Sequence, residues 1–150
     1  MTTTPPSAHD DAATVPELST LLRRHGLRRT PSRLCTLRML CTSGEHLSAA
    51  EIGTKLRQLG LPCDQATVYR TLETFADVGL AHAVHGPGNK RYGFSSQPHH
   101  HTVCEECGRV RDLAIEHMRE AVERIIELTG LRTGASGSLL LYGLCAHCSE

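Results

Sequence analysis

The chain has 150 residues, 39% of them hydrophobic, a size that allows one ordinary core or two very small ones, which often need a metal or a partner for stability. Its 16 basic and 16 acidic side chains balance, but residues 1–97 hold 11 Lys and Arg against eight Asp and Glu, whereas residues 98–150 hold five against eight. The polar start and the shortness of the longest apolar run, around 139–144, predict neither a secretory signal nor a membrane-spanning helix, so we expect a cytoplasmic protein.

The first half of the chain predicts a tail followed by four short helices. Residues 1–15 combine Thr, Pro, Ala and Asp without periodicity, a composition typical of a disordered tail. Thr30 and Asp64 are good N-cap residues, and Ser48 with Glu51 is a capping box. Apolar residues recur at helical spacing after these caps and before glycine stops. The predicted helical segments are 16–26, 30–41, 48–60 and 64–79.

A hairpin is predicted after the helices. Strand-like runs at 80–85 and 90–94 flank Gly86-Pro87-Gly88-Asn89, a strong turn signal. Short helices followed by a hairpin are typical of a winged helix, a helix-turn-helix variant whose second helix enters the major groove, although a generic small helical domain has the same pattern. We predict a winged-helix domain over 16–94, and a linker over 95–98.

The rest of the chain predicts a second unit. Two strands, an amphipathic helix from Ile115 to about Gly130 and a last strand over 139–144 make residues 99–150 a small α+β domain. The predicted fold class is therefore α+β, with an N-terminal winged helix-turn-helix domain followed by a second, small α+β domain.

Four of the seven cysteines form two CxxC pairs, Cys104 with Cys107 and Cys145 with Cys148. In a reducing compartment such pairs hold a metal more often than a disulfide. Redox-active CxxC motifs are the alternative, but neither pair begins a helix in a βαβ unit. Four thiolates satisfy one tetrahedral Zn²⁺ and leave no open position, so we predict one structural zinc per chain, which clips both ends of the small domain together.

A histidine run precedes the first cysteine pair. In a strand, its first and third members face one way and the second faces the other, so the outer two could share a metal. Histidines of the first domain could join them across the linker, and an aspartate of the next strand could complete the set. An ion held by both domains fixes the angle between them, so occupancy of the site by metal becomes a conformational signal. The alternative is that the three consecutive histidines are merely solvated and bind no metal. The predicted regulatory ligands are His46, His82, His99, His101 and Asp112.

Arginines predict a nucleic-acid partner. Six lie between Leu21 and Leu40 with no acidic residue among them, a pattern that suits phosphate binding or, alternatively, a merely solvated face. In the fourth helix, Arg70 can bond a guanine edge, Tyr69 can lie on a thymine methyl, and Thr67 suits phosphate. The predicted contacts to a double-stranded DNA operator are Arg28, Arg29, Arg33, Thr67, Tyr69 and Arg70.

Taken together, these motifs resemble the ferric-uptake-regulator (Fur) family of bacterial metal-responsive repressors. The resemblance spans 26–148 and consists of Gly-Leu-Arg-x-Thr-x-x-Arg, Ala-Thr-Val-Tyr-Arg-Thr-Leu, a His-rich run before Cys-x-x-Cys-Gly, and Leu-Tyr-Gly-x-Cys-x-x-Cys. It implies a homodimeric repressor, with 99–150 as the dimerisation domain, that binds an inverted-repeat operator when its regulatory metal is loaded. It also implies base reading by Tyr69 and Arg70, and metal-binding roles for the four cysteines and for His46, His99, His101 and Asp112.

Two departures from the family bear on the metal. The family usually has a Glu, Asp or Cys ligand just after the second wing strand, but here that stretch is Gly93-Phe94-Ser95-Ser96. His82 instead sits where some zinc-uptake regulators place a ligand, so the chain most resembles the zinc-uptake-regulator (Zur) branch. A site with three nitrogens and one oxygen favours zinc, while iron, manganese, nickel and peroxide sensing stay open.

Two other function classes compete with this reading. A zinc deaminase needs His-x-Glu and Pro-Cys-x-x-Cys, but His82 is followed by Ala83 and Val84 and no proline precedes Cys104, so we expect no enzyme. A zinc-stapled protein-interaction module that binds no DNA is the second alternative, which the arginine-rich segment disfavours.

Overall fold

The computed structural model describes residues 14–95, 99–132 and 138–150. The first helix begins at Val15, one residue before the predicted start, while the rest of the predicted tail (1–13) and of the linker (96–98) lies outside the described residues. None of the described helices is long and apolar enough to cross a membrane. The helices are α1 (Val15–Arg24), α2 (Pro31–Thr42), α3 (Ala49–Gln58), α4 (Gln65–Asp77) and α5 (Ile115–Thr129). The strands are β1 (Leu47–Ser48), β2 (Ala81–Val84), β3 (Arg91–Phe94), β4 (His99–Cys104), β5 (Val110–Ala114) and β6 (Leu140–Gly143).

The helix starts follow from the predicted caps. The Thr30 hydroxyl accepts the Arg33 backbone N–H at 3.3 Å, and the Asp64 carboxylate accepts that of Thr67 at 2.6 Å. At α3 the Ser48 hydroxyl and the Glu51 carboxylate accept each other's backbone N–H, as a capping box requires. These bonds satisfy amide groups that a helix leaves free at its N-terminus.

Helices α1 to α4 pack around one core with the first sheet. Leu72, Phe75 and Tyr92 are completely buried there, and burial of each such side chain contributes about 1.5–3 kcal/mol. The first sheet has the order β1-β3-β2, in which all pairs are antiparallel. The hairpin β2–β3 is the predicted wing, while β1 was not predicted. The other members of this core are Leu18, Leu22, Leu37, Leu40, Leu47, Ile52, Leu56, Val68, Leu80 and Ala81.

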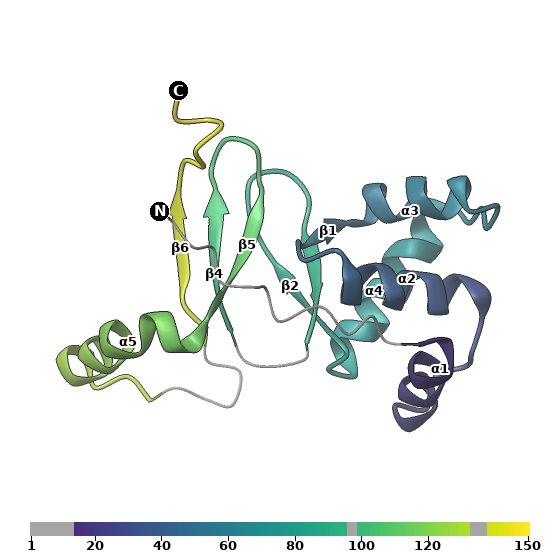
Figure 1. The fold of residues 1–150 in the computed structure, drawn as a ribbon, viewed down its shortest axis with the longest axis horizontal. Helices are drawn as coiled ribbons and strands as arrows, with labels where there is room; N and C mark the ends of the chain where they lie inside the picture. The colour runs from purple at the N-terminus through teal and green to yellow at the C-terminus, as the bar shows by residue number, and fades with distance from the viewer. Residues whose placement is uncertain (1–13, 96–98, 133–137) are drawn as a thin grey trace, which may run out of the picture.

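The second sheet has the order β5-β4-β6, in which β4 pairs antiparallel with β5 and parallel with β6. Helix α5 leads away from the end of β5, and Figure 1 shows it beyond the sheet, on the side opposite the helices of the first domain. The helices, wing and second sheet together confirm the predicted α+β class.

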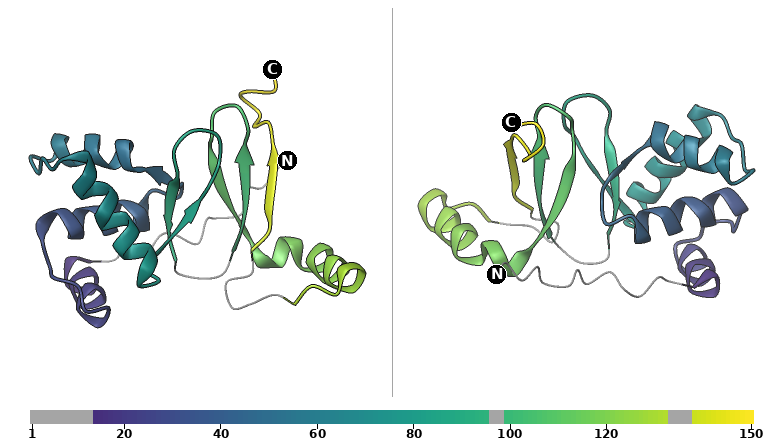
Figure 2. Two further views of the ribbon diagram at one scale, coloured as in Figure 1. Left: turned by 180° about the vertical axis from the view of Figure 1, so that it is seen from behind. Right: turned by 45° about the horizontal axis from the view of Figure 1, so that its top comes forward.

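The two sheets lie side by side in the middle of the molecule, as all views show (Figures 1 and 2). A small apolar cluster joins them, made of Val84 from β2 with Val103 and Val110 from β4 and β5. The Tyr142 hydroxyl also donates to the His85 backbone carbonyl at 3.3 Å. The wing therefore contacts the second domain directly.

Candidate metal centres

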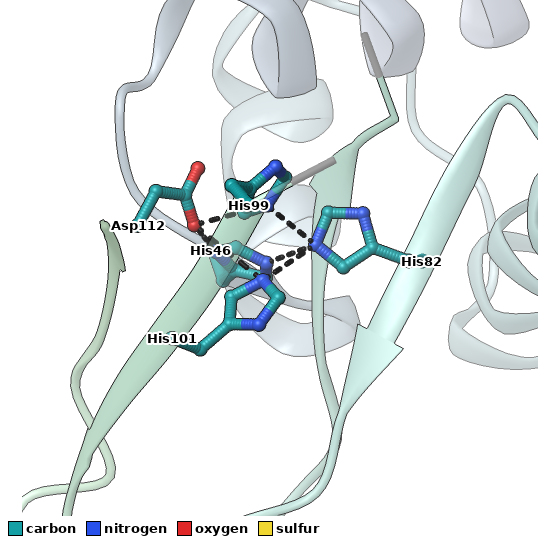
Figure 3. A group of neighbouring side chains, drawn as sticks. All are labelled: His46, His82, His99, His101 and Asp112. Carbon is teal, nitrogen blue, oxygen red and sulfur yellow. Dashed lines mark hydrogen bonds and ion pairs between the residues drawn. The ribbon is translucent and has the colours of Figure 1, made fainter. Parts of the chain in front are cut away.

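The structure brings the five predicted regulatory ligands to one point between the two domains (Figure 3). Their ligand atoms all lie within 4.8 Å of one another. His99 and His101 share one face of β4, and Asp112 of β5 is paired with His101. Strand alternation and register therefore place these three side chains on the same face of the sheet. His82 comes from β2, and His46 directly precedes β1. His100 faces away, where its Nδ1 accepts the Leu139 backbone N–H at 2.9 Å.

Three nitrogen contacts converge on a single atom, His82 Nε2. It lies 2.6 Å from His46 Nε2, 3.0 Å from His101 Nε2 and 3.2 Å from His99 Nε2. A neutral imidazole nitrogen is either one donor or one acceptor, so these three contacts cannot all be hydrogen bonds. A cation placed among the nitrogens would let each of them direct a lone pair at the same positive charge.

Burial keeps three of these imidazoles neutral. It lowers the pKa of His46 to about 2, with the neighbouring histidines as the next cause. It likewise lowers the pKa of His82 and of His101 to about 4, again with histidine neighbours adding to the effect. Their lone pairs are therefore free of protons at neutral pH, the state in which imidazole binds a metal.

Asp112 adds a carboxylate to the nitrogens. Its Oδ1 lies 3.2 Å from His46 Nδ1, 3.4 Å from His99 Nε2 and 3.7 Å from His101 Nε2. A divalent ion at the centre would thus meet a donor set of imidazoles and one carboxylate, which suits zinc and also nickel, copper and ferrous iron.

Ser95 contacts the His82 ring at the nitrogen that does not face the other histidines. Its hydroxyl lies 3.0 Å from His82 Nδ1, so the ring can donate its Nδ1 proton there while Nε2 faces the other ligands. Such outer hydrogen bonds fix the tautomer and orientation of ligand histidines. The segment that offers no direct ligand therefore contributes an orienting group, which the sequence did not indicate.

The four predicted cysteines form a second cluster at the far ends of β4 and β6. Cys107 Sγ and Cys145 Sγ lie 3.9 Å apart, close to the roughly 3.8 Å between sulfurs on a tetrahedral zinc with 2.3 Å bonds. Backbone N–H groups of Cys107 and Cys145 lower the pKa of the Cys104 thiol to about 6, which favours the thiolate. Gly108, with φ of 72°, allows the tight turn of the first knuckle. This geometry fits one structural zinc.

The predicted DNA contacts are accessible on the first domain. Tyr69 and Arg70 are exposed on α4, and an Arg70 nitrogen donates to the Thr67 hydroxyl at 3.2 Å. Arg28 and Arg29 are exposed in the turn before α2. Arg33, which is half-buried, donates to the Arg28 backbone carbonyl at 3.2 Å and so is partly committed to the protein itself.

A polar network that was not predicted supports Tyr69. Lys90 of the wing lies 5.8 Å from the centre of the Tyr69 ring, and 3.4 Å from the Glu73 carboxylate. The buried Tyr92 hydroxyl also donates to Glu73, and this bond lowers the pKa of that carboxyl. The wing is thereby tied to α4. The sequence held one signal of this network, because Tyr69 and Glu73 are four residues apart and so lie on one face of the helix.

Comparison with known proteins places this geometry in a family. The model described as "Ferric uptake regulator family" matches residues 24–136. The chain is 31% identical over 132 residues to the peroxide-responsive repressor PerR of Staphylococcus saprophyticus, a match that covers 87% of this chain and 88% of that protein. The ferric uptake regulator Fur of Vibrio cholerae aligns with a TM-score of 0.69 and 34% identity, over 85% of this chain and 98% of that one.

A zinc uptake regulator complexed with zinc and DNA aligns with a TM-score of 0.59 over 96% of this chain and 97% of that one, but at 24% identity this likeness shows the fold alone. Because the relatives at 31% identity are peroxide-responsive repressors, the predicted placement in the Zur branch stays a prediction. The extent of the family match and the identity to these relatives show that the chain belongs to the ferric uptake regulator family of metal-responsive transcription regulators.

Proposed function

We propose that this chain is a zinc-responsive repressor that binds an inverted-repeat DNA operator as a homodimer when its regulatory site is loaded. The observation that carries the proposal is the convergence of three imidazole nitrogens on His82 Nε2, with the Asp112 carboxylate beside them. These groups come from both domains, so an ion that binds them holds the domains in one relative orientation. An ion that binds this closed arrangement better than an open one shifts the population toward it.

The spacing of the donor atoms supports zinc. A tetrahedral zinc with Zn–N bonds of about 2.0–2.1 Å separates its ligand atoms by roughly 3.3–3.4 Å. The separations from His82 to His101 and to His99 are 3.0 and 3.2 Å, and those from Asp112 to His99 and to His101 are 3.4 and 3.7 Å. These four values scatter around the tetrahedral spacing, whereas the 2.6 Å between His46 Nε2 and His82 Nε2 is shorter.

Unburied apolar side chains of the second domain support the homodimer. No residue of α5 is buried, although Ile125 and Leu128 are among its apolar residues, and every residue of β6 is exposed. A second copy of the chain would cover these surfaces, and two-fold symmetry would then present two recognition helices to an inverted repeat.

Binding of the purified protein to a fluorescent palindromic AT-rich duplex tests the function. We expect binding that needs Zn²⁺ and weakens steeply as salt rises, because arginines near Arg28 neutralise phosphates. The double variant His82→Ala/His101→Ala should lose the metal response and keep one tightly held zinc per chain. Equal binding to random duplex with and without metal would contradict the proposal, as would a double variant that still responds to metal.

A second candidate is a peroxide response through iron at the same site, which the 31% identity to PerR favours. It predicts that Fe²⁺ supports DNA binding and that peroxide abolishes this binding, while the Zn²⁺-loaded protein is unaffected. The same duplex assay under anaerobic conditions, with and without peroxide, separates the two candidates.

A further inference from the structure

We propose that Gly93 is a positioning residue of the regulatory site, because its missing side chain leaves the space that the His46 ring occupies among the other ligands. The inference rests on the proposed function, since it takes the histidine cluster to be the regulatory metal site. It adds a residue that is not itself a ligand.

The sheet register sets Gly93 between two of the histidines. Strand β3 is the central strand of the first sheet, and on one flank Gly93 is paired with His82 of β2. On the other flank Leu47 is paired with Tyr92, so continuing the register by one residue sets His46 beside Gly93. Residues opposite one another in a sheet point to the same face. The two imidazoles therefore rise from chain segments about 9–10 Å apart, with only Gly93 between them.

The His46 ring fills the place of a side chain at position 93. A Cβ atom on Gly93 would lie 2.5 Å from His46 Nε2, 2.7 Å from its Cε1 and 2.8 Å from its Cδ2. All three distances are far below a van der Waals contact of about 3.5–4.0 Å. His46 is only 2% exposed and Gly93 is buried, so the ring has little room to move aside within the site.

Backbone conformation does not explain a glycine here. The φ angle of Gly93 is not positive, so any L residue can adopt its backbone conformation. Glycine weakens the interior of a strand, and it often marks a place where another group approaches closely. At position 93 the approaching group is an imidazole. Its Nε2 lies 2.6 Å from His82 Nε2 because nothing separates the two rings.

The test compares Gly93→Ala, His46→Ala and the double variant, each with its structural zinc retained. Gly53→Ala is the matched control, because it makes the same change in α3 of the same domain, where the new Cβ would meet only the ends of side chains, the nearest being Gln65. Affinity is measured for Zn²⁺ by competition with a chromophoric chelator. The visible absorption of bound Co²⁺ reports the number and kind of ligands, which a change in overall stability alone would not alter.

We expect Gly93→Ala to weaken Zn²⁺ binding at the regulatory site by roughly ten- to a hundredfold and to give the Co²⁺ spectrum of His46→Ala. The double variant should match His46→Ala in both measurements, because two changes that act through one group are not additive. Wild-type affinity and spectrum in Gly93→Ala would overturn the inference, as would a further loss in the double variant.

The double variant also covers a failure to fold. If Gly93→Ala alone is unfolded, a folded double variant supports the inference, because shortening His46 removes the clash, whereas two unfolded proteins would overturn it. A wild-type protein that binds Co²⁺ at this site without gaining affinity for DNA would contradict the proposed function and leave the role of Gly93 intact.

Discussion

Removal of the Ser95 hydroxyl should weaken the regulatory site without removing a ligand. In Ser95→Ala the 3.0 Å contact to His82 Nδ1 is lost, so the protein no longer holds the ring with Nε2 toward the other nitrogens. The Ser95 backbone bond to the Leu80 carbonyl, also 3.0 Å, is unaffected by the change, so the end of the wing should stay in place.

The size of the effect follows from exposure. Loss of an outer hydrogen bond to a ligand histidine costs roughly ten- to a hundredfold in metal affinity. Ser95 is exposed, so water can replace part of the hydroxyl's role and we expect the lower end, about tenfold or about 1.4 kcal/mol. His82→Ala removes the ligand itself and should cost far more.

Chelator competition with Zn²⁺ measures the difference, and Ser95→Thr is the control because it keeps a hydroxyl at the same place. We expect Ser95→Thr to bind within about twofold of the wild type, a difference of about 0.4 kcal/mol. If Ser95→Ala binds zinc as tightly as Ser95→Thr, the hydroxyl does not orient His82, and the reasoning from the 3.0 Å contact is wrong.

Three further predictions concern DNA, the cysteine site and pH. Arg70→Ala should lose about 1–3 kcal/mol of discrimination between operator and random duplex, with the dimer unchanged in sedimentation; undiminished discrimination would remove Arg70 from the base readers. Cys145→Ser should lose the structural zinc, seen in metal analysis, and the second domain should then melt at a lower temperature. An unchanged melting temperature would show that the metal does not stabilise this domain. Because the folded-state pKa values of His46, His82 and His101 lie below the unfolded value of about 6.5, the unfolded chain takes up more protons below that pH. Unfolding by urea, with the regulatory metal removed, should therefore become easier from pH 7.5 to 5.5, and a smaller change is expected in His82→Ala/His101→Ala.

The parts of the fold that depend on neighbours in sequence could be predicted. The caps at Thr30, Ser48 and Asp64 act within three residues of themselves, so their hydrogen bonds are visible in the sequence. The strand β1 was missed because it has only two residues and exists through pairing with β3, more than 40 residues away. The parallel pairing of β4 with β6 also joins residues far apart in sequence, such as His101 and Leu140.

The candidate site was predictable in its membership but not in its arrangement. Alternation along β4 was enough to assign His99 and His101 to one face. The approach of His46 to His82 depends on how three strands are ordered in a sheet, which residue types do not encode locally. The glycine inside a predicted strand was a signal for close approach, yet only the structure identifies the group that approaches Gly93.

Strand β4 carries members of both candidate metal clusters, with His99 and His101 near its start and Cys104 at its end. His101 and Cys104 are therefore only about 10 Å apart along a strand. A sample can lose zinc from its cysteines during purification, by chelation or by oxidation. The end of β4 would then no longer be held in place, although the start of the same strand must keep its register to position His99 and His101. Such a preparation would give a falsely weak metal response in vitro, so counting zinc per chain is a necessary step before any sensitivity is measured.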